Sequence, residues 1–131
     1  MTALQKSAWF NLSIVTLSLV IVAGLYPFVG WAAHAGLGLC GLLGFDPIFY
    51  RKRGTEVISD EREIMIQKRS TLIGYSVFWV VFVLTASLFS PFIYGQEGSV
   101  PVIVVQLSVF YAVVLFVGVM SISILIQNIK G

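Results

Sequence analysis

Three polar side chains, Asp46, His34 and Gln106, lie within long apolar stretches and are the residues best placed to do chemistry. A carboxylate or an imidazole inside a membrane is costly to bury and often handles protons or ions. Asp46 precedes Pro47, however, so a helix cap followed by a restart of the helix is the simpler interpretation. His34 has no second histidine, cysteine or acid close to it in sequence, so we expect an interfacial hydrogen bond there. Gln106, like Asn11, is expected to hydrogen-bond between helices.

Sequence motifs of catalysis do not occur in the chain. There is no HExxH, no nucleophile elbow and no glycine-rich phosphate loop. Cys40 is the single cysteine, which excludes an internal disulfide and a metal cage built from cysteines. We therefore expect neither an enzyme nor a metal or cofactor site.

The composition defines the class of protein that must position these residues. The chain is 58% hydrophobic and 11% charged, whereas soluble domains carry roughly 25% charged residues. A soluble fold of 131 residues could not bury so much apolar surface. We predict an all-α integral membrane protein with a single domain covering residues 1–131. The net charge of +2 gives no broad basic face, which argues against direct contact with nucleic acid.

Four stretches reach the length of about 20 apolar residues that a helix needs to cross a bilayer. They cover about residues 8–28, 31–50, 70–90 and 101–127. The first is longer than the apolar core of a signal peptide, so we expect it to be retained. Short turns separate the first stretch from the second, and the third from the fourth. The pattern predicts four transmembrane helices arranged as two antiparallel hairpins.

The charges gather between the two predicted hairpins. Residues 51–70 hold six of the eight Lys and Arg residues and four of the six Asp and Glu residues, and the remaining basic residues are Lys6 and Lys130. With four spans, all eight basic residues lie on one side of the membrane. The positive-inside rule makes that side cytoplasmic. We predict a multi-pass protein of the cell inner membrane with both termini and the segment 51–69 in the cytoplasm.

The charged segment also contains a helix start. Asp60 can cap the first turn, and Glu63 can reach back to complete a capping box. Glu61 and Glu63 complement the positive end of the helix dipole. No Pro or Gly follows before Gly74, so the third helix is expected to begin in the cytoplasm and continue unbroken into the bilayer.

A basic run after the second span and a Ser-Asp-Glu-Arg-Glu helix start, at Tyr50–Arg53 and Ser59–Glu63, resemble a known pattern. The chain is similar to a family of small uncharacterised four-span membrane proteins of bacteria and archaea. Members often occur beside small helix-turn-helix regulators, which implies a signalling or accessory role. The resemblance implies no enzymatic activity.

The second span is rich in small residues. These recur at every fourth position, a spacing that lets helices approach closely in lipid. We expect this stripe to pack against the first span or against a second copy of the chain in a homo-oligomer. The stripe consists of Ala32, Gly36, Cys40 and Gly44.

Together these features predict a non-catalytic accessory or signalling protein whose segment 51–70 contacts a partner protein or anionic membrane lipid. Basic residues beside a membrane gain about 1 kcal/mol each from anionic lipid, so topology anchoring alone is an alternative role. A small oligomeric channel or transporter remains open as a second function. A small membrane-embedded enzyme is a third, although the Arg/Glu/Asn signature of small glutathione-dependent membrane enzymes is missing. The expected contact residues are Arg51, Lys52, Arg53, Asp60, Glu61, Arg62 and Glu63.

Overall fold

The computed structural model of the chain describes residues 1–50, 60–95 and 98–130, and all secondary structure in these ranges is helical. One long element is a 3₁₀ helix and one short element is a π-helical turn. The elements are α1 (Ala3–Val29), η1 (Gly30–Tyr50, 3₁₀), α2 (Glu61–Leu84), η2 (Thr85–Phe89, π), α3 (Ser90–Tyr94) and α4 (Val102–Lys130).

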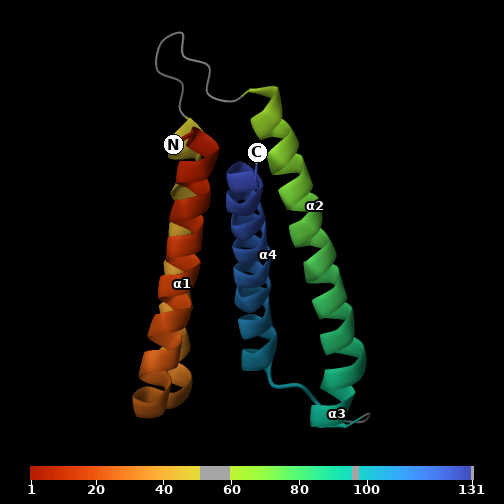
Figure 1. Cartoon of the computed structure of the whole chain (residues 1–131). Coiled ribbons are helices and arrows are strands. Elements are labelled where there is room, and N and C mark those ends of the chain that lie inside the picture. Colours follow the sequence, from red (N-terminus) through yellow and green to blue (C-terminus); the bar gives the residue numbers. More distant parts are fainter. Residues whose placement is uncertain (51–59, 96–97, 131) are drawn as a thin grey trace.

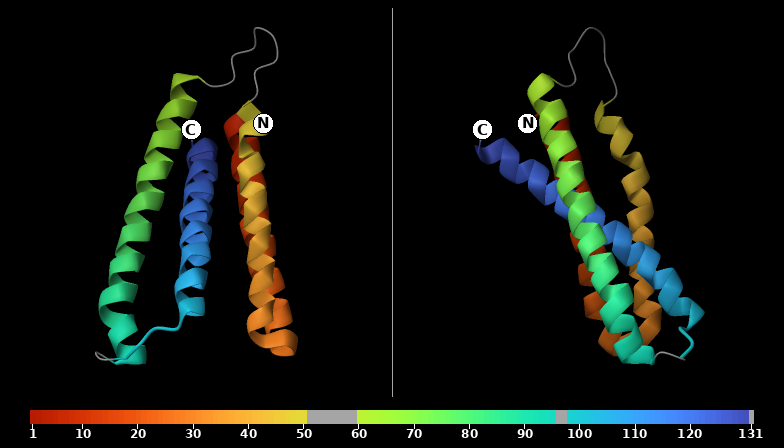
Figure 2. Two further views of the ribbon diagram at one scale, coloured as in Figure 1. Left: turned by 180° about the vertical axis from the view of Figure 1, so that it is seen from behind. Right: turned by 90° about the vertical axis from the view of Figure 1, so that its right-hand side faces the viewer.

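Three continuous helical stretches in the described residues are long and apolar enough to cross a membrane: Ala3–Tyr50, Glu61–Tyr94 and Val102–Lys130. The prediction of an all-helical chain with membrane-spanning segments is confirmed at this level. The first stretch reverses direction at Gly30, so that α1 and η1 lie side by side and antiparallel (Figures 1 and 2). As a result, the N-terminus, the start of α2 and the C-terminus lie at one end of the bundle (Figure 1).

Local sequence signals explain the ends of α1. The Thr2 hydroxyl accepts from the Gln5 backbone N–H at 3.2 Å, and the Gln5 side chain accepts from the Thr2 N–H at 3.0 Å. This capping box starts the helix at Ala3, five residues before the predicted start. The helix continues past Pro27 and ends at Gly30, whose φ of +60° favours glycine.

The 3₁₀ conformation of η1 makes it as long as α1 with fewer residues. The 27 residues of α1 rise about 1.5 Å each and cover about 40 Å. The 21 residues of η1 rise about 2.0 Å each and cover about 42 Å. Since 3₁₀ helices seldom exceed about four residues, this length is unusual. It allows the two arms of the hairpin to pair from end to end.

The buried face of η1 follows a spacing of three, as expected for three residues per turn. Leu37 and Cys40 are buried, and Leu43 packs against the same core, which includes Val15 and Val22 of α1. A spacing of four residues drifts around such a helix. For this reason the predicted stripe is divided between two faces: Gly36 and Cys40 lie on the α1 side, while Ala32 and Gly44 are exposed.

Helix α4 is the central element, because it lies between the α1–η1 hairpin and α2 (Figures 1 and 2). Small residues mark both contacts. A Cβ atom at Gly118 would lie 3.6 Å from Val15 Cγ1 of α1, and one at Gly74 of α2 would lie 3.3 Å from the Phe116 carbonyl oxygen. Without a hydrophobic drive between helices in lipid, such close backbone approach is a main source of packing energy.

Helix α2 begins at Glu61, as predicted. The helical stretch that it starts does not end at the predicted break at Ser90 and Pro91. A π-helical turn at Thr85–Phe89 follows α2, and the chain stays helical to Tyr94. A π turn places an extra residue in one turn. The helical path is therefore reshaped before Ser90 rather than broken at it.

The register of η1 on α1 can be tested with a pair of glycine substitutions. Gly36→Ala places a Cβ 2.8 Å from Ile21 Cγ2, whereas a Cβ at Gly41 has no neighbour within 4 Å. We expect G36A to lower the free energy of unfolding by about 1–3 kcal/mol through overpacking. G41A, with the same gain in helix propensity, should be neutral or stabilising. Reversible unfolding in mixed detergent micelles measures both, and equal effects would contradict the register.

Candidate functional site

Asp46 lies at the centre of a polar cluster between α1 and η1. Its Oδ1 accepts hydrogen bonds from the Ser7 hydroxyl and from Asn11 Nδ2, the latter at 3.2 Å. Ser7 and Asn11 are buried, with 3% and 5% of their surfaces exposed. The prediction that Asn11 bonds between helices is therefore confirmed. A carboxylate with two buried donors on one oxygen is held firmly, since charge-assisted bonds are about twice as strong as neutral ones.

The interpretation of Asp46 as a cap before a helix restart is wrong. Helix η1 continues through Pro47 to Tyr50 without interruption, and the Asp46 carboxylate bonds across to α1. The cause is the register of the hairpin. From Gly30 to Asp46 a 3₁₀ helix covers about 32 Å. Along α1, Asn11 and Ser7 lie about 28 Å and about 34 Å from the same turn, so the carboxylate falls between them.

Tyr50 is the last residue of η1. It packs against the buried cluster formed by Leu4 and Ala8 of α1, Ile66 of α2 and Ile124 of α4. The last turn of η1 therefore contacts the core that also holds the first turns of α2.

The start of α2 has the predicted cap in part. Asp60 Oδ1 accepts from the Glu63 backbone N–H at 2.8 Å, which confirms Asp60 as the N-cap. The Glu63 side chain makes no return bond to Asp60 among the described contacts. It is 8% exposed, whereas Glu61 and Arg62 are exposed. One turn later Ile66 packs with Leu4 and Ala8 of α1 and Ile124 of α4.

The remaining predicted residues lie elsewhere. His34 is half-buried at the opposite end, and its Nδ1 lies 3.1 Å from the Trp31 carbonyl oxygen, which confirms the expected interfacial hydrogen bond. Gln106 is exposed on α4 and makes no hydrogen bond among the described contacts, so the expectation that it bonds between helices is wrong. The basic run at residues 51–53 falls outside the described residues. In the described residues, no three His, Cys, Asp or Glu side chains gather as a metal site would require.

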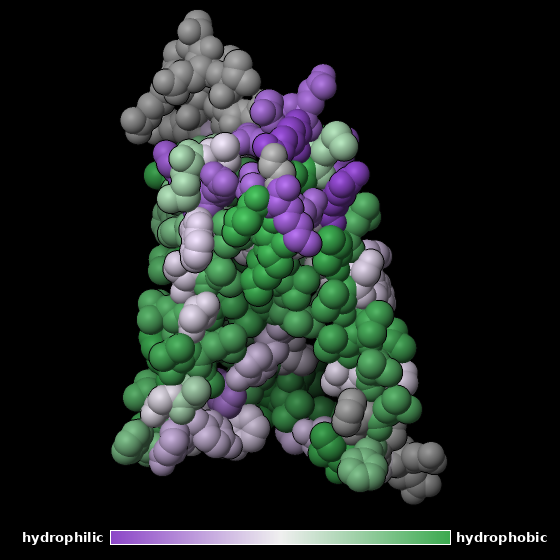
Figure 3. Space-filling view, in the orientation of Figure 1, coloured by the Kyte–Doolittle hydropathy of each residue, from purple (hydrophilic) through white to green (hydrophobic). Residues whose placement is uncertain are grey.

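A second polar contact was not expected from the sequence. Gln127 Nε2 of α4 donates to Ser70 Oγ of α2 at 2.9 Å and to Ser123 Oγ at 3.0 Å. It lies at the same end of the bundle as the Asp46 cluster. Hydrophilic side chains gather at this end over the start of α2, and the middle of the molecule is mainly hydrophobic (Figure 3). Hydroxyl groups spaced along apolar helices were the available signal for both contacts.

Comparison with protein-family models, curated proteins and solved structures finds no match to this chain. The family resemblance of the Tyr50–Arg53 and Ser59–Glu63 pattern therefore stays a prediction.

The Asp46 cluster makes a prediction for stability. Asp46→Ala leaves the donors of Ser7 and Asn11 buried and unpaired, at about 1–3 kcal/mol for each group. We expect a loss of about 2–4 kcal/mol in the free energy of unfolding, and a coupling of about 1 kcal/mol with Asn11→Ala in a double-mutant cycle. A matched cycle of Asp46→Ala with Ser108→Ala, at the far end of the bundle, should show coupling below about 0.5 kcal/mol. Similar coupling in both cycles would contradict the cluster.

Proposed function

We propose that the chain is a four-pass protein of the cell inner membrane, with α1, η1, α2 to α3, and α4 as its crossings and with both termini in the cytoplasm. The reversal at Gly30 supports this, since it turns the first apolar stretch into two antiparallel arms (Figure 1). The charge distribution agrees, because the described Lys and Arg residues belong to the parts of α1, α2 and α4 towards the end that holds both termini, and the other three follow η1 directly in the sequence. Basic residues on one side of the membrane mark the cytoplasmic side.

Cysteine labelling tests this topology. In a Cys40→Ala background, we expect Val29→Cys and Ser99→Cys to react with a membrane-impermeant maleimide in intact cells. Lys130→Cys should react only after the membrane is permeabilised. Labelling of Lys130→Cys in intact cells, or protection of Val29→Cys, would exclude four crossings with cytoplasmic termini.

For the biochemical role, we infer a non-catalytic accessory or signalling function, in which segment 51–70 contacts a partner protein or anionic lipid. One observation carries this inference: α2 starts beyond the ends of α1 and α4 (Figure 1), yet its first turns also pack into the bundle. Glu61 and Arg62 are exposed, while Glu63 and Ile66 on the same turns are buried. A contact made on the exposed face therefore acts directly on the packed face.

The packed face offers a route for such a contact into the membrane. Ile66 packs with Leu4 and Ala8 in the first turns of α1, and Tyr50 at the end of η1 packs against the same cluster. A shift of the α2 start would therefore change the packing around Tyr50, which follows Asp46 by about one turn of η1. The energy needed is small, since a few kcal/mol separate the states of a typical switch.

The alternative function, an oligomeric channel or transporter, needs polar groups aligned across the membrane. Among the described residues, the buried hydroxyl and carboxyl groups concentrate at the charged end, and the cavities of the opposite half are lined mainly by apolar side chains. This distribution favours the accessory role.

Neutralising the basic run tests the proposed contact. We compare Arg51→Gln/Lys52→Gln/Arg53→Gln with a control variant, Lys6→Gln/Lys130→Gln, which removes basic residues outside segment 51–70, in pull-downs from membrane and cytosolic extracts. If the run binds a partner, the triple variant should lose that partner at unchanged topology. If it binds lipid, the partner set stays unchanged, and a fluorophore at Ser59→Cys should move away from nanodiscs containing phosphatidylglycerol, since about 1 kcal/mol per charge is lost. If the partner set and the position of the fluorophore both stay unchanged, the proposed contact is rejected.

A further inference from the structure

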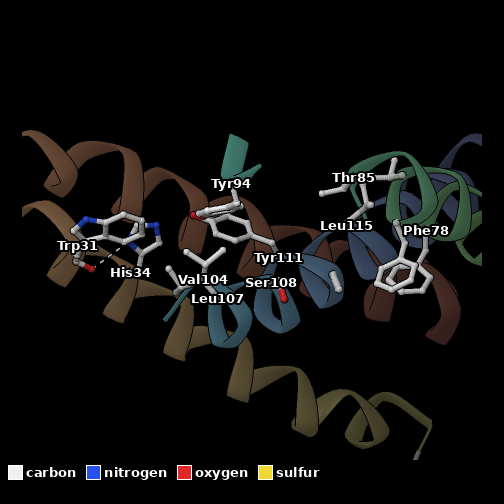
Figure 4. Close-up of a pocket in the computed structure, with 13 residues that line it drawn as sticks. Trp31, His34, Phe78, Thr85, Tyr94, Val104, Leu107, Ser108, Tyr111 and Leu115 are labelled. Carbon is white, nitrogen blue, oxygen red and sulfur yellow. Dashed lines mark hydrogen bonds between the residues drawn. The ribbon is translucent and has the colours of Figure 1, made fainter. Parts of the chain in front are cut away.

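A cavity of about 480 Å³ lies in the half of the bundle farthest from the charged end. Its walls come from η1 on one side and from α2, α3 and α4 on the other (Figure 4). The space-filling view shows a hollow between the two limbs in this half (Figure 3). The volume falls within the range of about 300–1,000 Å³ typical of small-molecule sites.

The cavity exists because α2 and α4 touch in one half and separate in the other. They meet where Gly74 approaches Phe116 and where Ser70 bonds Gln127. Beyond Gly74, the α2 side chains Phe78 and Phe82 face an open space instead of α4 backbone. A second cavity, on the other side of the same separation, shares these two side chains as its wall. Each cavity is thus an open groove between diverging helices.

Polarity changes along the cavity. Trp31 and His34 lie at one end and Phe78 at the other, with Tyr111 between them (Figure 4). The end at Leu115 and Phe78 is mainly apolar, with Thr85 as its one polar side chain (Figure 4), and the end with His34 is next to the Gly30 turn. In the proposed topology, the polar end lies at the outer interface and the apolar end lies deeper. Such a gradient matches an amphiphile inserted from the outer leaflet, with its head outward.

His34 gives the polar end a defined hydrogen-bonding group. A carbonyl oxygen can only accept, so the contact of His34 Nδ1 with Trp31 O at 3.1 Å puts a proton on Nδ1. The ring stacks on Trp31, at 5.3 Å between centroids and 25° between planes, and Tyr111 meets it edge-on at 6.0 Å. Nε2 is therefore held in one place. It accepts from a hydroxyl or a protonated carboxyl group and, when His34 is charged, donates to a carboxylate.

We propose that this cavity binds a single-chain fatty acid, with its carboxyl group at His34 Nε2 and its chain between α2 and α4. The thirteen described residues that line the cavity include no Asp or Glu to repel the head group. A carboxyl group bonds to His34 in either protonation state of the pair, which a simple ester cannot do. The proposal concerns a different end of the molecule from the cytoplasmic contact and stands independently of it.

Tryptophan fluorescence offers a direct test on the full chain in nanodiscs. Trp31 lines the cavity, whereas Trp79 lies on α2 and does not line it, and both rings are exposed to a similar degree, 58% and 43%. We compare a protein that keeps only Trp31 (Trp9→Phe/Trp79→Phe) with one that keeps only Trp79 (Trp9→Phe/Trp31→Phe). The probe is a fatty acid brominated in mid-chain, which quenches indole on contact. We expect saturable quenching of Trp31 at concentrations about tenfold below those that quench Trp79.

The head group and the cavity are tested separately. The methyl ester of the same probe should bind about tenfold more weakly, and His34→Phe should abolish the preference for the acid. Ala112→Phe fills the cavity and should remove the saturable phase, while Val105→Phe, on an exposed position of the same helix, should keep it. Thermal unfolding of each variant checks folding, and the comparison of acid with ester needs no cavity variant.

Three results would overturn the proposal. Parallel quenching of Trp31 and Trp79 would mean partition into the bilayer only. Equal affinity for acid and ester would remove His34 as the head-group partner. Protection of Trp31 from the probe, together with a cross-linked dimer that Ala112→Phe abolishes, would mean that a second copy of the chain fills the cavity.

Discussion

The pairing of a 3₁₀ helix with an α-helix is the constraint on which the rest of this bundle depends. Both arms of the first hairpin cover about 40 Å, although η1 has 21 residues and α1 has 27. Equal length places Asp46 opposite Ser7 and Asn11, and it places Tyr50 beside the start of α1. An α-helical second arm would cover about 24 Å from Gly30 to Asp46. The carboxylate would then lie near Ile14, in the apolar core.

From this hairpin the molecule divides into a closed half and an open half. In the closed half, polar groups bond within the α1–η1 hairpin and between α4 and α2, and small residues let α4 approach both neighbours. In the open half, α2 leaves α4 and aromatic side chains line the space between them. Contacts of the closed half fix the helices relative to one another, and the open half leaves apolar side chains accessible.

The helical class, the membrane-spanning character and the start of α2 could all be predicted from the sequence. Their signals are local: long apolar runs, and an acidic cap at Asp60 followed by a helix without Pro or Gly. The early start of α1 was predictable as well, since Thr2 and Gln5 form a recognisable capping box.

The conformation of η1 was not predictable, because its residues are compatible with an α-helix and its 3₁₀ form depends on pairing with α1. The partners of Asp46 depend on the rise per residue of this 3₁₀ helix, so they could not be predicted either. The contacts of Gly74 and Gln127 could not be predicted from local sequence, because both residues lie where α2 and α4, which are distant in sequence, come together. His34 could be assigned a hydrogen bond, but the ring that stacks on it and the cavity it faces required the fold.

The rise of η1 has a further consequence for how this part of the chain can change. Each residue in a 3₁₀ helix advances the chain by a third of a turn. Exchange of a side chain on the exposed face, such as that of Ala35 or Gly38, leaves the hairpin intact. Loss of one residue between Gly30 and Asp46, in contrast, would rotate every later side chain by about 120° and turn the carboxylate away from α1. The number of residues between Gly30 and Asp46 therefore matters more for this contact than the identity of those on the exposed face. Diverged versions of the protein should keep this length.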